Sequence, residues 1–163
     1  MPTMEEVAKL SREQKFARMT RTADDLAAAI RGQSGAALAK RPDATNWAAV
    51  ECIAHLRDAE EGFQQRFDLI LAVTDPKLGG PNADRMAEER QYLRNDAADA
   101  VGAFRRRREE TLAFLGKLTP EQWQRAGVHP ARGRITIEDF VTLMTWHDDN
   151  HLDQLKRALE GKA

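Results

Sequence analysis

The segment Thr136–Glu160, TIEDFVTLMTWHDDNHLDQLKRALE, has the pattern of an amphipathic helix that carries two histidines on its apolar face. Thr136 is followed three residues later by Asp139, a spacing typical of a capped helix start. Apolar side chains then recur at helical intervals, and His147 and His151 fall on the stripe formed by Phe140, Met144, Leu155 and Ala158. The segment therefore predicts a helix that turns both imidazoles toward the interior of a helical protein.

The rest of the chain also favours helix, because alanine, leucine, arginine and glutamate dominate and β-branched residues are sparse. We predict three further helices, over about Met4–Ala29, from an N-cap at Thr45 or Asn46 to about Thr74, and over Asp96–Leu118. The segment Lys77–Asn95 is rich in glycine, proline and charge at its start, and we interpret it as a long crossover with a partial helical turn. The predicted fold is an all-α four-helix bundle that forms one domain over residues 1–163.

The composition limits the classes of protein to which this chain is expected to belong. The chain has 163 residues, with 25 basic and 26 acidic side chains and a net charge of -1, so it lacks the excess basic charge that attracts nucleic acid. Cys52 is the only cysteine and no secretion signal is visible at the N-terminus, which indicates a reducing, cytoplasmic location. No stretch approaches the roughly 18 to 20 apolar residues that crossing a bilayer requires, so we expect no membrane partner.

The spacing of the two histidines is suited to metal chelation, because residues four apart on a helix project from the same face. Two inward imidazoles without partners would each cost about 1–3 kcal/mol, and a shared metal ion would remove that cost. His55, in the predicted second helix, supplies a third inward imidazole. Metal sites in bundles are assembled from facing helices, so His55, His147 and His151 form a reasonable set of ligands.

Three patterns carry a resemblance to a known family. They are Trp47 with His55-Leu56-x-Asp58-x-Glu60, the stretch Leu118-Thr119-Pro120-Glu121-Gln122-Trp123 followed by Gly127-Val128-His129-Pro130, and Trp146-His147-Asp148-x-x-His151-Leu152-x-Gln154-Leu155. Together they resemble the DinB-like family, especially its YfiT-like branch, over nearly the whole chain. The resemblance implies an up-down-down-up four-helix bundle with a three-histidine metal site, and these three histidines stand where the family pattern puts them.

Three neutral imidazoles suit zinc, nickel or iron(II), and with only three protein ligands a coordination position stays open for water or substrate. Such an ion can lower the pKa of bound water or hold a thiol as thiolate, and the sequence is compatible with both kinds of chemistry. The resemblance implies thiol S-transferase or hydrolase chemistry, with a low-molecular-weight thiol as a cosubstrate in some relatives. We therefore expect a metal-dependent enzyme acting on a small molecule. The alternative is a non-enzymatic stress-responsive or metal-responsive bundle in which the ion is structural.

Two carboxylates near His55 are the candidate catalytic groups. Glu51 lies one turn before it and could serve as general base, fourth ligand or hydrogen-bond acceptor for a ligand, and Asp58, three residues after it, has similar options. An ordinary surface or capping role is the alternative for both. Asp148 could orient an imidazole, reach another helix or remain solvated.

Several other residues have simpler interpretations. His129 reaches the site only if its loop folds over it, Arg66 could meet an anionic substrate but is expected in solvent, and Cys52 is expected in the core. The tryptophans are expected to be packing anchors, and the run Arg105–Arg108 is expected to be a solvated helix face. A homodimer, common in the family that the chain resembles, is the remaining expectation.

Overall fold

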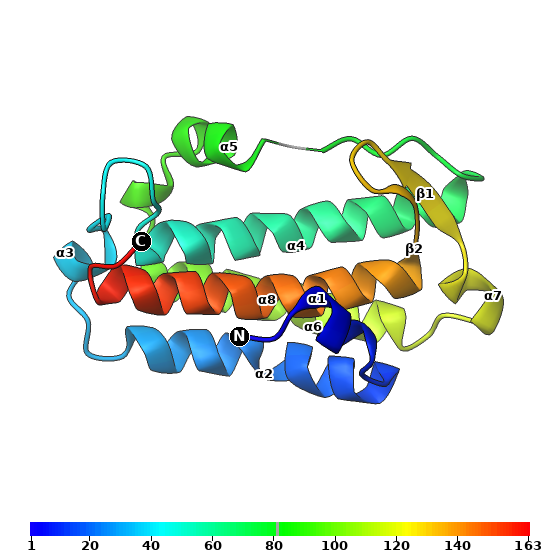
Figure 1. Ribbon diagram of the computed structural model, residues 1–163, viewed down its shortest axis with the longest axis horizontal. Helices are drawn as coiled ribbons and strands as arrows, with labels where there is room; N and C mark the ends of the chain where they lie inside the picture. Colours follow the sequence, from blue (N-terminus) through cyan, green and yellow to red (C-terminus); the bar gives the residue numbers. More distant parts are fainter. Residues whose placement is uncertain (81) are drawn as a thin grey trace.

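Four long helices build the molecule, and the computed structural model describes residues 1–80 and 82–163. The helices are α2 (Arg12–Ile30), α4 (Ala49–Ala72), α6 (Ala97–Leu115) and α8 (Ile137–Leu159), and they lie side by side (Figure 1). Helix α4 packs against α6 and α8, and α2 packs against the same two helices from the other side. The prediction of a four-helix bundle is confirmed.

The order of directions is up-down-down-up. Helices α4 and α6 run the same way, opposite to α2 and α8, so the chain must return along the outside of the bundle before α6 begins (Figure 1). The predicted crossover is therefore present. It contains more helix than expected, namely α5 (Ala83–Glu89) and the short 3-10 helix η1 (Tyr92–Arg94), while residue 81 lies outside the described part of the chain.

The prediction of one continuous first helix is wrong. A separate α1 (Met4–Ala8) precedes α2, because Ser11 begins a new helix with reciprocal capping. The Ser11 hydroxyl accepts from the backbone amide of Gln14 at 3.1 Å, and the Gln14 side chain accepts from the amide of Ser11 at 2.9 Å. After α2 the chain forms a short helix, α3 (Gly35–Leu38), within the glycine-serine connection.

The predicted N-cap of the second helix is also wrong. Asp43 accepts hydrogen bonds from the backbone amides of Thr45 and Asn46, both at 2.8 Å, so these residues form a turn stabilised by Asp43. Helix α4 begins three residues later, at Ala49.

A small hairpin, absent from the predicted all-α fold, precedes α8. After α7 (Pro120–Trp123), strands β1 (Ala126–His129) and β2 (Gly133–Thr136) pair antiparallel. The hairpin is bonded to the start of the crossover, since Val128 donates to the carbonyl of Pro76 at 2.8 Å and accepts from the amide of Leu78 at 2.9 Å. Gly127 permits this approach, because a Cβ atom there would lie 2.7 Å from the Leu78 side chain.

None of the helices in the described residues combines the length and the apolar character that a membrane span requires.

The apolar core is divided into two clusters. One cluster contains Leu26, Leu56, Phe104 and Leu155 among others. The second, farther toward the hairpin, contains Met19, Phe67, Leu115, Phe140 and Met144. Between the two lies a layer of buried polar side chains contributed by all four long helices: Thr22, Glu60, Arg108 and Asp148.

Arg108 is the centre of this polar layer, so the prediction that the whole Arg105–Arg108 run is a solvated face is wrong at this position. Its guanidinium donates to both carboxylate oxygens of Glu60 and to both of Asp148, and its remaining N–H bonds the carbonyl of Met19 at 3.0 Å. All five N–H groups are therefore satisfied. Burial alone would lower the pKa of Arg108, but the charges of Asp148 and Glu60 raise it above its usual value.

Replacing Arg108 with methionine should destabilise the protein by about 3–5 kcal/mol, because two carboxylates would remain buried without their cation. Arg106→Met is the matched control, since Arg106 belongs to the same run and is exposed, and it should stay within about 0.5 kcal/mol of wild type. Urea unfolding followed by circular dichroism measures both. Equal midpoints for the two variants would contradict the account of this layer.

Candidate metal centre

Helices α4 and α8 bring three imidazoles to one point beside the polar layer. His55 comes from α4, and His147 and His151 come from successive turns of α8. One ring nitrogen from each of the three lies within 4.8 Å of the other two, and the Nε2 atoms of His55 and His147 are 3.0 Å apart. The structure thus brings together the three histidines that the sequence singles out.

This spacing fits a single transition-metal ion. Two imidazole nitrogens bound tetrahedrally to zinc at about 2.0–2.1 Å lie about 3.4 Å from each other. The separations in the cluster, from 3.0 Å to at most 4.8 Å, bracket that value. Two such nitrogens facing each other need either a shared proton or an ion between their lone pairs, so the cluster has the chemistry of a ligand set.

All three imidazoles are held in the neutral form that binds metals. Burial, followed by the proximity of His151, lowers the pKa of His55 to about 3. Burial also lowers the pKa of His147 well below its usual value and that of His151 in the same direction. At neutral pH each ring therefore keeps a lone pair, as a metal ligand must.

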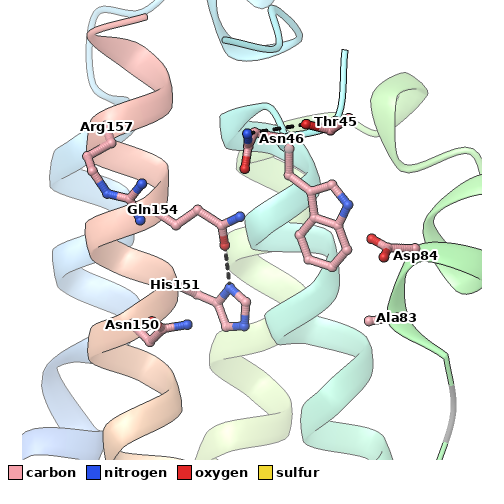
Figure 2. Close-up of a pocket in the computed structure, with 9 residues that line it drawn as sticks. Thr45, Asn46, Ala83, Asp84, Asn150, His151, Gln154 and Arg157 are labelled. Atoms are coloured by element: carbon pink, nitrogen blue, oxygen red, sulfur yellow. Dashed lines mark hydrogen bonds between the residues drawn. The ribbon is translucent and has the colours of Figure 1, made fainter. Parts of the chain in front are cut away.

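Gln154 fixes the tautomer of His151, a contact that the sequence reasoning did not identify although Gln154 stands in the quoted motif. The Nδ1 atom of His151 lies 2.8 Å from Oε1 of Gln154 (Figure 2). Because a carbonyl oxygen can only accept, Nδ1 carries the proton and the lone pair of His151 is on Nε2. A second contact comes from Trp47, whose ring stacks on His151 with the centroids 6.1 Å apart.

Two adjoining cavities, which share Ala83 in their walls, border the histidine cluster. The larger, of about 890 Å³, is lined by His55 and His147 and extends to the crossover and the hairpin. The smaller, of about 410 Å³, is lined by His151, Gln154 and Arg157 of α8 and by Asp84, which faces them (Figure 2). Trp47 also lines it. Molecules could therefore approach the cluster through either cavity.

Glu51 has contacts that suit a structural role. Its carboxylate receives two hydrogen bonds from Arg41, at 2.8 and 2.6 Å, and a third from the backbone amide of Ala48 at 2.9 Å. Glu51 thus completes the start of α4 and ties it to the preceding loop. Its part in catalysis stays a prediction that these contacts do not support.

Asp58 lines the larger cavity beside His55, but its carboxylate is also occupied. It accepts from Arg57 at 2.8 Å, from Arg90 at 2.8 Å and from the hydroxyl of Tyr92 at 2.8 Å. Burial acts to raise its pKa, yet these hydrogen bonds hold the pKa well below the usual range. So weak a base is poorly suited to take a proton at neutral pH, and Asp58 instead holds the crossover onto α4.

The Asp148 side chain contacts residues of other helices, which is one of the three roles predicted for it. It receives a hydrogen bond from the Thr22 hydroxyl at 2.6 Å in addition to those from Arg108. As the neighbour of His147 on α8, it links the polar layer to the histidine cluster.

Two residues stand closer to the site than expected. The hairpin brings His129 to the wall of the larger cavity, and Arg66 lines the same wall while its guanidinium donates to the carbonyl of Gly79 at 3.0 Å.

Cys52 is buried as predicted, and burial raises the pKa of its thiol to about 12. Trp47 and Trp123 are buried packing residues, as predicted.

Comparisons with known proteins agree with one another. A family model described as the DinB superfamily matches residues 18–155. A protein of Oceanobacillus iheyensis, whose name gives metal-dependent hydrolase as an inferred activity, is 28% identical over 122 residues, which are 72% of this chain and 68% of that protein. YfiT from Bacillus subtilis, described as a probable metal-dependent hydrolase with an unusual four-helix bundle topology, superposes with a TM-score of 0.84. It is 21% identical, over 95% of this chain and 92% of that chain, and so shows the shared fold.

Asp58→Asn should lower stability at pH 7 by about 1.5–3 kcal/mol, the usual worth of hydrogen bonds to a charged group. The pKa of Asp58 is depressed in the folded state. Asp58 therefore contributes fully to the free energy of unfolding at a pH above its pKa in the unfolded state, about 3.9, and this contribution is lost as the pH falls below that value. Urea unfolding at pH 7 and at pH 3 should therefore show a gap between wild type and variant that narrows in acid. Asp68→Asn, at an exposed position of α4, is the control. A gap that does not depend on pH would refute this role of Asp58.

Proposed function

The chain belongs to the DinB superfamily, and on this premise we propose that it is a metal-dependent enzyme that acts on a small molecule, by hydrolysis or by thiol S-transfer, at an ion held by His55, His147 and His151. One observation carries the proposal. Three neutral imidazoles converge to within 4.8 Å beside a cavity of about 890 Å³. The metal-dependent hydrolase activity ascribed to the Oceanobacillus and Bacillus relatives supports it.

The number of ligands favours a catalytic ion over a structural one. Within residues 1–80 and 82–163, the cluster contains three metal-binding side chains and no fourth. Structural zinc sites are closed by four protein ligands, whereas catalytic sites keep a position for water or substrate. Two of the three histidines line the larger cavity, so an open position would be accessible to a small molecule.

The donor set suits zinc, nickel or iron(II), each of which accepts imidazole nitrogen. When bound, such an ion acts as a Lewis acid that lowers the pKa of a coordinated water or thiol and polarises a substrate. The contributions of the protein itself are different. Gln154 orients His151, Trp47 packs against two of the imidazoles, and burial keeps all three rings neutral.

The second cavity favours a reaction of two substrates. The smaller cavity meets His151 from the side of Trp47 and Asp84, whereas the larger meets His55 and His147. Hydrolysis requires room for one organic substrate and water. Transfer from a low-molecular-weight thiol requires room for two organic molecules, and these two adjoining cavities, which share Ala83 in their walls, would supply it.

Untagged wild-type protein should contain roughly one divalent ion per chain, and His147→Ala should lose it, because two remaining imidazoles bind more weakly than three. Elemental analysis after dialysis against a metal-buffered solution provides the measurement. His129→Ala is the control, since it removes an imidazole from the cavity wall outside the cluster and should retain the ion. Full occupancy in His147→Ala would rule out the proposed ligand set.

Gln154→Leu should weaken zinc affinity about 10- to 100-fold, because His151 would lose the acceptor that fixes its tautomer. Gln154→Glu keeps an acceptor oxygen at the same place and should remain close to wild type. Competition with a chromophoric chelator measures the affinities. If the leucine variant bound zinc as tightly as the glutamate variant, Gln154 would have no part in positioning the ligand.

A further inference from the structure

The larger cavity is long as well as wide, and its length follows α4. His55 and Arg66 both line it, and they stand eleven positions apart on this helix. At 1.5 Å of rise per residue, their Cα atoms lie about 16 Å apart along the axis. The cavity therefore suits an elongated molecule whose two ends meet different surroundings.

The end away from the histidines contains a cation without a counterion. The guanidinium of Arg66 is bonded to the carbonyl of Gly79, lies 5.7 Å from the ring centroid of Phe63, and pairs with no carboxylate of the described residues. Burial lowers the pKa of Arg66, which reflects the cost of holding this charge away from water. Arg90, by contrast, lines the same cavity and is paired with Asp58 at 2.8 Å.

The acidic residues of the cavity do not compensate for this charge. Asp58 is bonded to Arg57 and Arg90, and Glu61 pairs with Arg107 at 3.3 Å. An unpaired, partly buried arginine on a cavity wall is a favourable place for an anion, because charge-assisted hydrogen bonds are about twice as strong as neutral ones.

His129 adds a neutral donor at the same end. Its Nδ1 atom accepts hydrogen bonds from the backbone amides of Ala131 at 3.1 Å and Arg132 at 3.2 Å. Nδ1 is therefore unprotonated, and Nε2 carries the proton. Burial and the nearby charges of Arg66 and Arg132 lower the pKa of His129, so the ring stays neutral at pH 7 and offers Nε2–H as a donor.

The wall between the two ends is largely apolar. Phe63 lies between His55 and Arg66 on α4, Leu69 follows Arg66 by one turn, and Leu78 and Met86 of the crossover complete the apolar part of the lining. Such a surface favours a hydrocarbon or aromatic segment, whose burial is worth roughly 25 cal/mol per Å².

We propose that the substrate, or one of the two substrates, is an elongated small molecule with an anionic head group bound by Arg66 and His129, an apolar middle, and a reactive group at the three histidines. This inference deepens the proposed function and rests on it for the reactive end alone. The anion site itself consists of residues that belong to neither the histidine cluster nor the polar layer.

Octanoate is a suitable probe, with octanamide as its neutral analogue and inorganic phosphate as an anion without an apolar segment. Isothermal titration at pH 7 with zinc-loaded protein should show octanoate binding to wild type and to the control Arg106→Met alike. Arg66→Met should bind it at least about 10-fold more weakly, the usual effect of losing a charged hydrogen bond. Arg66→Lys keeps the charge and should retain most of the affinity. Octanamide and phosphate should bind more weakly than octanoate to wild type.

A carboxylate could instead bind the ion, and His147→Ala separates the two possibilities. Octanoate should bind this variant within about 3-fold of wild type, since Arg66 lies about 16 Å along the helix from the cluster. Binding that disappears in His147→Ala but survives in Arg66→Met would overturn the proposal, as would absence of octanoate binding to wild type. Failure of the metal site itself would show differently, as protein without an ion that still binds octanoate through Arg66.

Discussion

The buried guanidinium of Arg108 connects all four long helices of the bundle. It joins α6 to Glu60 on α4, to Asp148 on α8 and to the backbone of α2 at Met19. Burying three charges is costly unless every donor and acceptor is paired. Here all five N–H groups of the guanidinium are used, so the four helices can meet only in the register that completes this set.

That register also assembles the histidine cluster. Glu60 lies little more than one turn after His55 on α4, and Asp148 follows His147 directly on α8. Fixing the two carboxylates around one arginine therefore fixes the two helical surfaces that carry the imidazoles. The apolar clusters on either side of the polar layer exclude water from it. The histidines line the two cavities, and the burial of their own rings keeps them neutral. Stability and ligand chemistry thus depend on one layer of the bundle.

The sequence revealed those features that depend on local spacing. The four long helices and the inward direction of His147 and His151 follow from helical periodicity, and the crossover follows from the glycine, proline and charge in Lys77–Asn95. The break before Ser11 was missed, since one continuous helix was predicted there, although Ser11 and Gln14 have capping-box spacing. The burial of Arg108 could not be predicted from local spacing. An arginine within a run of four is expected in solvent, and its partners Glu60 and Asp148 lie on other helices. The placement of His129 and Arg66 likewise depends on how the hairpin packs against the crossover. Backbone hydrogen bonds between Val128 and residues Pro76 and Leu78 hold the two segments together. Because these bonds involve no side chains, the types of residue in the sequence do not indicate them.

In the proposed metal centre, His55, His147 and His151 hold one ion and leave a coordination position free. X-ray absorption spectroscopy of the zinc-loaded protein tests it most directly, because imidazole and sulfur ligands differ in bond length and in multiple scattering. The expected spectrum shows three imidazole nitrogens at about 2.0–2.1 Å and one further light atom from solvent. A sulfur ligand at about 2.3 Å, which would have to come from Cys52 or a methionine, or a shell with fewer than three imidazoles, would contradict it.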